Sequence, residues 1–249
     1  MDDLTLKLIL TVVVIAIALA AGLPTLAAQR GDFRSRALGW GEAFAAGVFL
    51  GAGLIHMLGD ADGDFAAAGL DYPYAPMLCG ATMLLLLWLE HFGQRALSGD
   101  GGTLMPAMAA AMLSLHSLLT GAAFGVSSTV AVTLVIFLAV LAHKGAASFA
   151  LALELRRGTL ERRRALSIFL VFVVMFPVGV AIGQSIEAAS GRHPLVEPVF
   201  GSLAAGTFLF FGTLHGLASS PMIARCCNFR EFVGALAGFC VMAVVAIWT

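Results

Sequence analysis

Two histidines lie deep inside long apolar runs of this chain. His116 falls within residues 113–125 and His143 within residues 140–155. An ionisable side chain at membrane depth is costly to bury, so it marks a functional site by default. Imidazole nitrogen is a ligand for borderline divalent metals such as Zn²⁺, Cu²⁺, Ni²⁺ and Fe²⁺. The first hypothesis is a metal site. The alternative is that each imidazole only hydrogen-bonds across helices and holds them together.

A tight turn predicts that these histidines meet. Residues 101–143 hold no charged side chain and are too many for one span, so the helix must break at the small polar residues 125–128. His116 then lies about ten residues before the turn and His143 about sixteen after it, which at 1.5 Å per residue gives a depth difference of about 9 Å or less. We expect the two imidazoles to approach one another near the membrane midplane.

Two hydroxyls and an amine accompany the histidines. Thr120 lies four residues after His116 and shares its face, Ser117 flanks it, and Lys144 follows His143 directly. Two imidazoles completed by hydroxyls or water make a weak site, which suits a protein that must release what it binds. Lys144 is a candidate for gating or coupling, because losing its proton as a metal arrives would link metal movement to protons.

The composition indicates whether these residues are surrounded by water or by lipid. With 60% hydrophobic and 12% charged residues, the chain is predicted to be an integral membrane protein. Its first residues lack the positive region of a secretory signal, so we expect the first apolar run to remain as a span. The four cysteines show no metal-binding spacing and are interpreted as small packing residues: Cys79, Cys226, Cys227 and Cys240.

The charges divide the chain into apolar runs of about the 20 residues that one span needs. We therefore predict an all-α fold in which residues 1–249 form a single membrane domain of eight transmembrane helices. An acidic, glycine-rich loop is expected at residues 59–64, continuing to residues 71–73. The helices are predicted at residues 4–28, 37–58, 75–93, 105–125, 129–155, 165–186, 199–218 and 232–248.

Basic residues predict how the helices are oriented. The connections after the first, third, fifth and seventh spans hold eleven arginines, and the opposite connections hold only Arg192. Because cytoplasmic loops carry the excess of Lys and Arg, both termini and the acidic loop are expected outside. The eleven are Arg30, Arg34, Arg36, Arg95, Arg156, Arg157, Arg162, Arg163, Arg164, Arg225 and Arg230.

Five stretches resemble the ZIP (Zrt/Irt-like) family of metal transporters, in the family's order. Residues 116–125, HSLLTGAAFG, are similar to the fourth-helix pattern HSxxEGxAxG, and residues 143–149, HKGAASF, to the fifth-helix variant HKxxxAF. Residues 47–61, GVFLGAGLIHMLGDA, resemble the second helix, GVFLxxxxxHLLPDA. Residues 176–183, FPVGVAIG, resemble PxGxxxG of the sixth, and residues 205–210, AGTFLF, resemble AGTFLY of the seventh.

This resemblance implies movement of a divalent metal towards the cytoplasm, usually zinc and sometimes iron or manganese. It also implies an inverted-repeat bundle whose fourth and fifth helices carry the site, and a midplane site is expected of such folds.

The chain departs from the family at its acidic positions. Thr120 replaces the fourth-helix acid, Lys144 and Ala147 replace the fifth-helix acids, and His215 stands at the seventh-helix Glu position. A lysine ammonium where a second cation would sit repels it, by about 4 kcal/mol at about 4 Å and intermediate dielectric. The resemblance therefore supports one weak metal site, made by His116, Ser117, Thr120 and His143.

Other polar residues predict a route through the membrane. His56 and Asp60 are four residues apart at the outer end of the second span and are candidates for the substrate entrance; the alternative is an exposed helix end with a solvated carboxylate. His215 is the candidate for the exit, because it occupies a family ligand position.

The sequence thus predicts a ZIP-like transporter, not an enzyme, of the inner (plasma) membrane. Its expected partners are a divalent metal ion and the lipid bilayer, without nucleic acid, and a homodimer is left open. Two alternatives also stay open: a metal-binding regulator that no longer transports, and a transporter of another cation, organic or a proton.

Overall fold

The computed structural model describes residues 3–28, 36–96, 101–127, 129–190, 194–217 and 229–248. Within these ranges all regular structure is helical, as predicted, and it forms eight rods, two of which contain a π-helical turn. The elements are α1 (Asp3–Ala27), α2 (Arg36–Gly51), η2 (Ala52–Met57), α3 (Leu58–Ala67), α4 (Tyr74–Ala96), α5 (Gly101–Val126), α6 (Val130–Arg157), α7 (Arg162–Ser190), α8 (Val196–Leu209), η3 (Phe210–Leu217) and α10 (Phe229–Val245).

Seven of the described rods are long and apolar enough to cross a membrane. The eighth, α10, has 17 residues, slightly fewer than the about 20 of a typical span. Large apolar side chains point away from the protein, as on α4, where Leu84, Trp88 and Phe92 are 68%, 59% and 59% exposed. Such a surface suits lipid rather than water, so the chain is a multi-pass membrane protein.

The predicted acidic loop is wrong over residues 59–64, because this stretch is helical, and the chain leaves the helix only for residues 68–73. The second rod runs without a break from α2 through η2 into α3 and ends at Ala67. Its glycines and aspartates favour a loop, but Ala61 and Phe65, one turn apart, are only 2% and 3% exposed and pack with Ala75 of α4. Burial of this stripe overrides the weak helix propensity of its neighbours.

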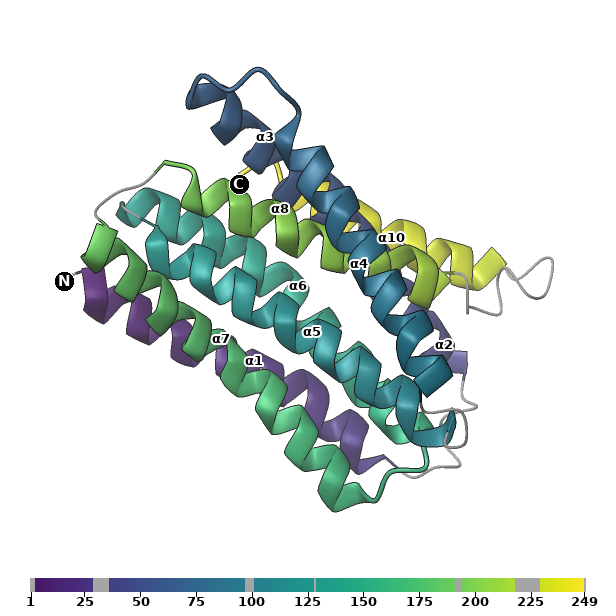
Figure 1. Cartoon of the computed structure of the whole chain (residues 1–249). Coiled ribbons are helices and arrows are strands. Elements are labelled where there is room, and N and C mark those ends of the chain that lie inside the picture. The colour runs from purple at the N-terminus through teal and green to yellow at the C-terminus, as the bar shows by residue number, and fades with distance from the viewer. Residues whose placement is uncertain are drawn as a thin grey trace.

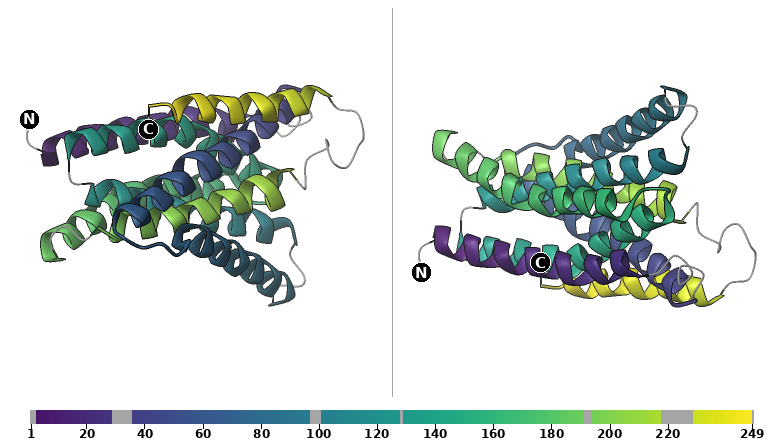
Figure 2. Two further views of the ribbon diagram at one scale, coloured as in Figure 1. Left: turned by 90° about the horizontal axis from the view of Figure 1, so that it is seen from above. Right: turned by 90° about the horizontal axis from the view of Figure 1, so that it is seen from below.

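The rods pack in pairs that are not all neighbours in sequence. The helix α5 lies along α7 (Figure 1), while α1 packs along α6 and α2 along α10. The start of α1 and the end of α10 lie toward the same end of the bundle (Figure 2). The connection between α6 and α7 lies at the opposite end from the start of α1 (Figure 1).

Glycines bring α5 and α7 into backbone contact. A Cβ at Gly121 would lie 3.1 Å from the Cα of Gly179, and a Cβ at Gly125 would lie 2.9 Å from the Cα of Gly183. Each helix therefore presents two glycines four residues apart, the small-residue spacing by which membrane helices approach closely. This contact fixes α5, which carries His116, against α7.

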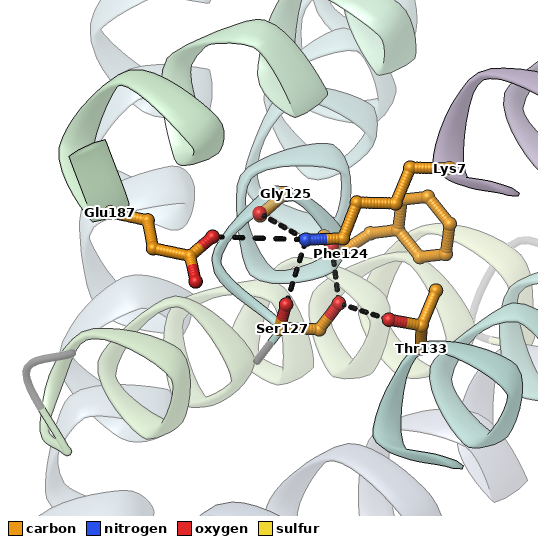
Figure 3. A network of polar contacts seen from close by, with 6 residues as sticks. All are labelled: Lys7, Phe124, Gly125, Ser127, Thr133 and Glu187. Atoms are coloured by element: carbon orange, nitrogen blue, oxygen red, sulfur yellow. Dashed lines mark hydrogen bonds and ion pairs between the residues drawn. The ribbon is translucent and has the colours of Figure 1, made fainter. Parts of the chain in front are cut away.

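A buried lysine ties α1 to the end of α5. The Nζ of Lys7 donates hydrogen bonds to the carbonyls of Gly125 at 3.0 Å and Ser127 at 2.7 Å, and it lies 3.8 Å from a carboxylate oxygen of Glu187 on α7 (Figure 3). Carbonyls at the end of a helix lack partners within it, and a cation there also complements the helix dipole. Lys7 thus fixes the turn between α5 and α6, a role that the sequence did not reveal.

Candidate metal site

The two predicted histidines meet in the centre of the bundle. The rings of His116 on α5 and His143 on α6 have their centroids 5.6 Å apart and are 2% and 1% exposed. The turn that joins the helices is as short as predicted: α5 ends at Val126 and α6 begins at Val130, with Thr129 capping α6 by accepting a hydrogen bond from the Val132 amide. A short turn leaves the helices antiparallel, which brings the rings to similar depth.

The ring of His116 is oriented by α8. Thr207 donates its one hydroxyl hydrogen to the Ala204 carbonyl at 2.6 Å, so its oxygen accepts from Nδ1 of His116 at 2.7 Å. The Ala204 carbonyl, which can only accept, also lies 3.2 Å from Nδ1. These contacts place the ring proton on Nδ1 and leave the lone pair on Nε2. Nε2 is buried and makes no hydrogen bond in the structure. A donor bond at one ring nitrogen with a free lone pair at the other is the arrangement of a metal-binding histidine.

Phe208 of α8 sets the position of both rings. It stacks on His116 with centroids 3.5 Å apart and meets His143 edge-on at 4.8 Å. Nδ1 of His143 is buried and has no hydrogen-bond partner in the structure. Both imidazoles therefore keep nitrogen capacity that protein groups do not use.

The remaining predicted ligands are placed differently. The hydroxyl of Thr120 donates to the His116 carbonyl at 2.9 Å, which leaves its oxygen lone pairs available. The hydroxyl of Ser117 is 2.6 Å from Nζ of Lys144, whose ammonium also lies 4.3 Å from the ring centroid of Phe172. Ser117 is thus engaged by the lysine, and the lysine is held by a hydroxyl and an aromatic face.

A cavity of about 70 Å³ leads to His143, and we name it the His143 cavity. Apart from Thr120 and His143, its polar lining comes from the second and seventh rods: His56, Asp60, Asp64 and Glu197. Nδ1 of His56, in η2, lies 2.6 Å from a carboxylate oxygen of Asp60, in α3. The two predicted entrance residues therefore face the same cavity as the central histidine.

Two lining carboxylates escaped the sequence analysis. Asp64 lies four residues after Asp60 and eight after His56, a helical spacing that was hidden by the predicted loop. Glu197 stands in the first turn of α8, before the predicted start of that span. Both are close enough to Asp60 for their charges to interact. The cavity wall is therefore more acidic than the sequence alone predicted.

Two further points concern a metal site with three ligands and the predicted exit residue. Among the described residues, no three His, Cys, Asp or Glu side chains gather closely enough to hold one metal ion. His215 belongs to η3, but its side chain lies outside what the structure describes, so its predicted exit role stays a prediction.

Residues 102–246, which include His116, His143 and the helices around them, match the family model described as ZIP Zinc transporter. The chain belongs to the ZIP family. The membership predicted from the five sequence stretches is thereby confirmed.

Proteins of animals and of Dictyostelium discoideum are among its relatives. The chain is 29% identical over 260 residues to Zinc transporter ZIP2 of Mus musculus, which covers 82% of this chain and 83% of that protein. It is also 29% identical over 259 residues to Zinc transporter ZIP2 of Homo sapiens, with the same coverage. Protein zntD of Dictyostelium discoideum is 34% identical over 151 residues, which is 58% of this chain but 22% of that protein. Membership of the ZIP family supports a metal-ion transporter rather than an enzyme.

Proposed function

We propose that this ZIP-family chain moves a divalent metal cation towards the cytoplasm through a single weak site at His116 and His143. Zinc is the first candidate, with iron and manganese as alternatives. The observation that carries the proposal is Nε2 of His116, a buried lone pair without a hydrogen-bond partner in the structure. A buried polar atom left without a partner costs about 1–3 kcal/mol, and a metal ion would remove that cost.

Hydroxyls and water complete the metal's coordination in this proposal. Thr120 lines the His143 cavity and retains oxygen lone pairs, so it can join the two imidazoles directly. Ser117 can join only after Lys144 gives up its hydroxyl. Without a carboxylate ligand the cation keeps its double charge in a dry site, so binding should be weak and release easy.

The His143 cavity supplies the entrance. His56 and Asp60 receive the cation, and Asp64 and Glu197 add negative charge to the same wall. Acidic clefts with low-dielectric walls concentrate cations, so the cavity provides the attraction that the neutral central ligands lack. His215 remains our candidate for the exit.

Orientation follows from the arginines. With the arginine-rich connection between α6 and α7 in the cytoplasm, both termini and the acidic wall of the cavity face outside. The two π-helical turns support an inverted repeat, because they interrupt the second and seventh rods alike. Moreover, η2 packs against α8 while η3 packs against α2. Such repeats place the binding site at their interface, near the midplane.

Lys144 couples this movement to protons in our proposal. It follows His143 directly and its ammonium is buried between Ser117 and aromatic rings. An arriving divalent cation repels this ammonium, and release of the lysine proton removes the repulsion.

The test is zinc uptake into proteoliposomes. Radioactive zinc flux through the wild-type protein is compared with flux through His116→Ala/His143→Ala, and zinc binding to both proteins is measured in detergent. We expect saturable flux in the wild type and loss of both flux and binding in the variant. Binding without flux in the wild type would instead select a metal-responsive regulator. If the wild type binds no zinc and other divalent metals do not compete, the result would select a transporter of another cation.

A further inference from the structure

A second, smaller cavity lies between α2, α6 and η3. It measures about 30 Å³, and we name it the Glu154 cavity. Among the described residues, its ionisable lining residues are Glu42 of α2 and Glu154 of α6, and the other described lining residues are alanine, leucine and phenylalanine. Two carboxylates from different helices therefore converge on a small, otherwise apolar space.

A positive side chain already occupies these carboxylates. The guanidinium of Arg157, the last residue of α6, lies 2.5 and 2.6 Å from the two carboxylate oxygens of Glu42. The same group lies 3.3 Å from an oxygen of Glu154. Glu42 and Glu154 are 16% and 23% exposed, whereas Arg157 is 37% exposed. Within the described part of the chain, one guanidinium thus pairs with both carboxylates, and it is the most exposed of the three groups.

The helix geometry aligns this cavity with the central site. Glu154 follows His143 by eleven residues, about three turns, so both lie on nearly the same face of α6, about 16 Å apart along its axis. Between them on that face stand Ala147 and Ala150, and Ala150 also lines the Glu154 cavity. A face of small side chains therefore leads from the central histidine to the second pair of carboxylates.

We propose that Glu42 and Glu154 form a second binding site for a divalent cation, which the guanidinium of Arg157 occupies until a metal ion displaces it. The proposal rests on the proposed function, since the cation reaches this end from the histidine pair. Two carboxylates together carry the charge that balances one divalent ion. Oxygen ligands favour hard cations, so manganese suits this site better than it suits the imidazoles.

Replacing the guanidinium of Arg157 by a metal ion costs the protein little free energy. Because Arg157 is partly exposed at the end of its helix, its guanidinium can turn into water without leaving a buried charge behind. The competing explanation is that Arg157 only ties α6 to α2. The two explanations differ in what happens when Arg157 is removed: a tie leaves nothing to bind, whereas a site gains an ion.

The experiment counts manganese ions bound to the full-length protein in lipid nanodiscs, by electron paramagnetic resonance of free Mn²⁺. We expect Arg157→Ala to bind about one more Mn²⁺ per chain than the wild type at equal concentration. The extra ion should be absent from Arg157→Ala/Glu42→Gln/Glu154→Gln. An Arg157→Ala protein that binds no more Mn²⁺ than the wild type overturns the proposal, and so does an extra ion that survives the loss of both carboxylates.

Two further variants make the outcome decisive. Arg157→Lys keeps a positive charge at the cavity but lacks the planar fork of guanidinium, so a metal should displace it at lower concentration than it displaces arginine. If Arg157→Ala does not fold, unchanged Mn²⁺ binding by Arg157→Lys overturns the proposal instead. Adding His116→Ala/His143→Ala to Arg157→Ala should leave the extra ion in place. Failure of the central site therefore cannot be mistaken for failure of this one.

Discussion

Each end of the bundle holds a basic side chain against neighbouring helices, and the two contacts differ in what they can exchange. Lys7 is fully buried and bonds mainly to the backbone carbonyls of Gly125 and Ser127. Arg157 is partly exposed and bonds to the carboxylates of Glu42 and Glu154. Carbonyls at a helix end need a donor permanently, whereas carboxylates accept any cation. The first contact is a fixed structural link, and the second can be replaced by the transported ion.

The largest expected effect is on stability and separates the two contacts. Lys7→Met leaves two buried carbonyls unsatisfied, at about 1–3 kcal/mol each, and should lower the unfolding temperature strongly. Arg157→Ala removes a partly exposed ion pair, which is worth about 1 kcal/mol or less. Thermal unfolding in detergent measures both. Equal destabilisation by the two substitutions would contradict the distinction.

Removal of the carboxylates at the Arg157 end should slow transport without weakening the fold. In Glu42→Gln/Glu154→Gln the cation loses the binding site that follows the histidine pair. We therefore expect the maximal zinc flux to fall about tenfold while KM changes little. Concentration-dependent uptake in proteoliposomes measures both constants, and Glu90→Gln on the exposed part of α4 is the matched control. An unchanged maximal flux would leave the Glu154 cavity without a transport role.

Between the two ends of the bundle, the orientation of the His116 ring should control the affinity for zinc. Thr207→Val removes the nearer of the two acceptors at Nδ1 and leaves the Ala204 carbonyl at 3.2 Å. Loss of such a partner weakens metal binding about 10-fold to 100-fold. Thr207→Ser keeps the hydroxyl and serves as the control, with affinity close to that of the wild type. Zinc titration of the purified proteins is the measurement. Equal affinity in all three proteins would mean that the α8 contact does not orient a ligand.

The sequence predicted what depends on residues close together in the chain. Apolar runs of span length located the helices, and a short turn brought His116 and His143 together. It missed Thr207 beside His116, Lys7 beside Gly125 and Arg157 beside Glu42. These pairs are 91, 118 and 115 residues apart, and no local pattern encodes them. Asp64 was missed for another reason, because burial of Phe65 made a helix where composition favoured a loop.

Neutralising the His143 cavity should affect capture rather than maximal flux. In Asp64→Asn/Glu197→Gln, His56 and Asp60 remain, so we expect KM for zinc to rise about threefold at low ionic strength and less at high salt. Uptake at two salt concentrations tests this. A fall in maximal flux with unchanged KM would mean that both cavities act at the same step, and the comparison of the two ends would fail.

The smallest expected effect is a change in pH dependence. If Lys144 releases a proton when metal binds, zinc affinity in the wild type rises with pH, because raising the pH favours the proton-free lysine. Lys144→Met has no such proton to release and should show a flatter profile. Zinc titrations across a pH series compare the two slopes, and parallel profiles would remove Lys144 from the coupling.

The π-helical turn η2 gives the second rod a change of phase. A π-turn accommodates one residue more than an α-helical turn, so the residues after it are rotated by about 100° relative to an uninterrupted helix. Before the turn, Gly47 and Gly51 face α10; after it, His56 and Asp60 face the His143 cavity. Deleting one residue from η2 would turn this acidic wall away from the histidines while leaving its composition intact. The chemistry of the entrance therefore depends on a count of residues as much as on their identity.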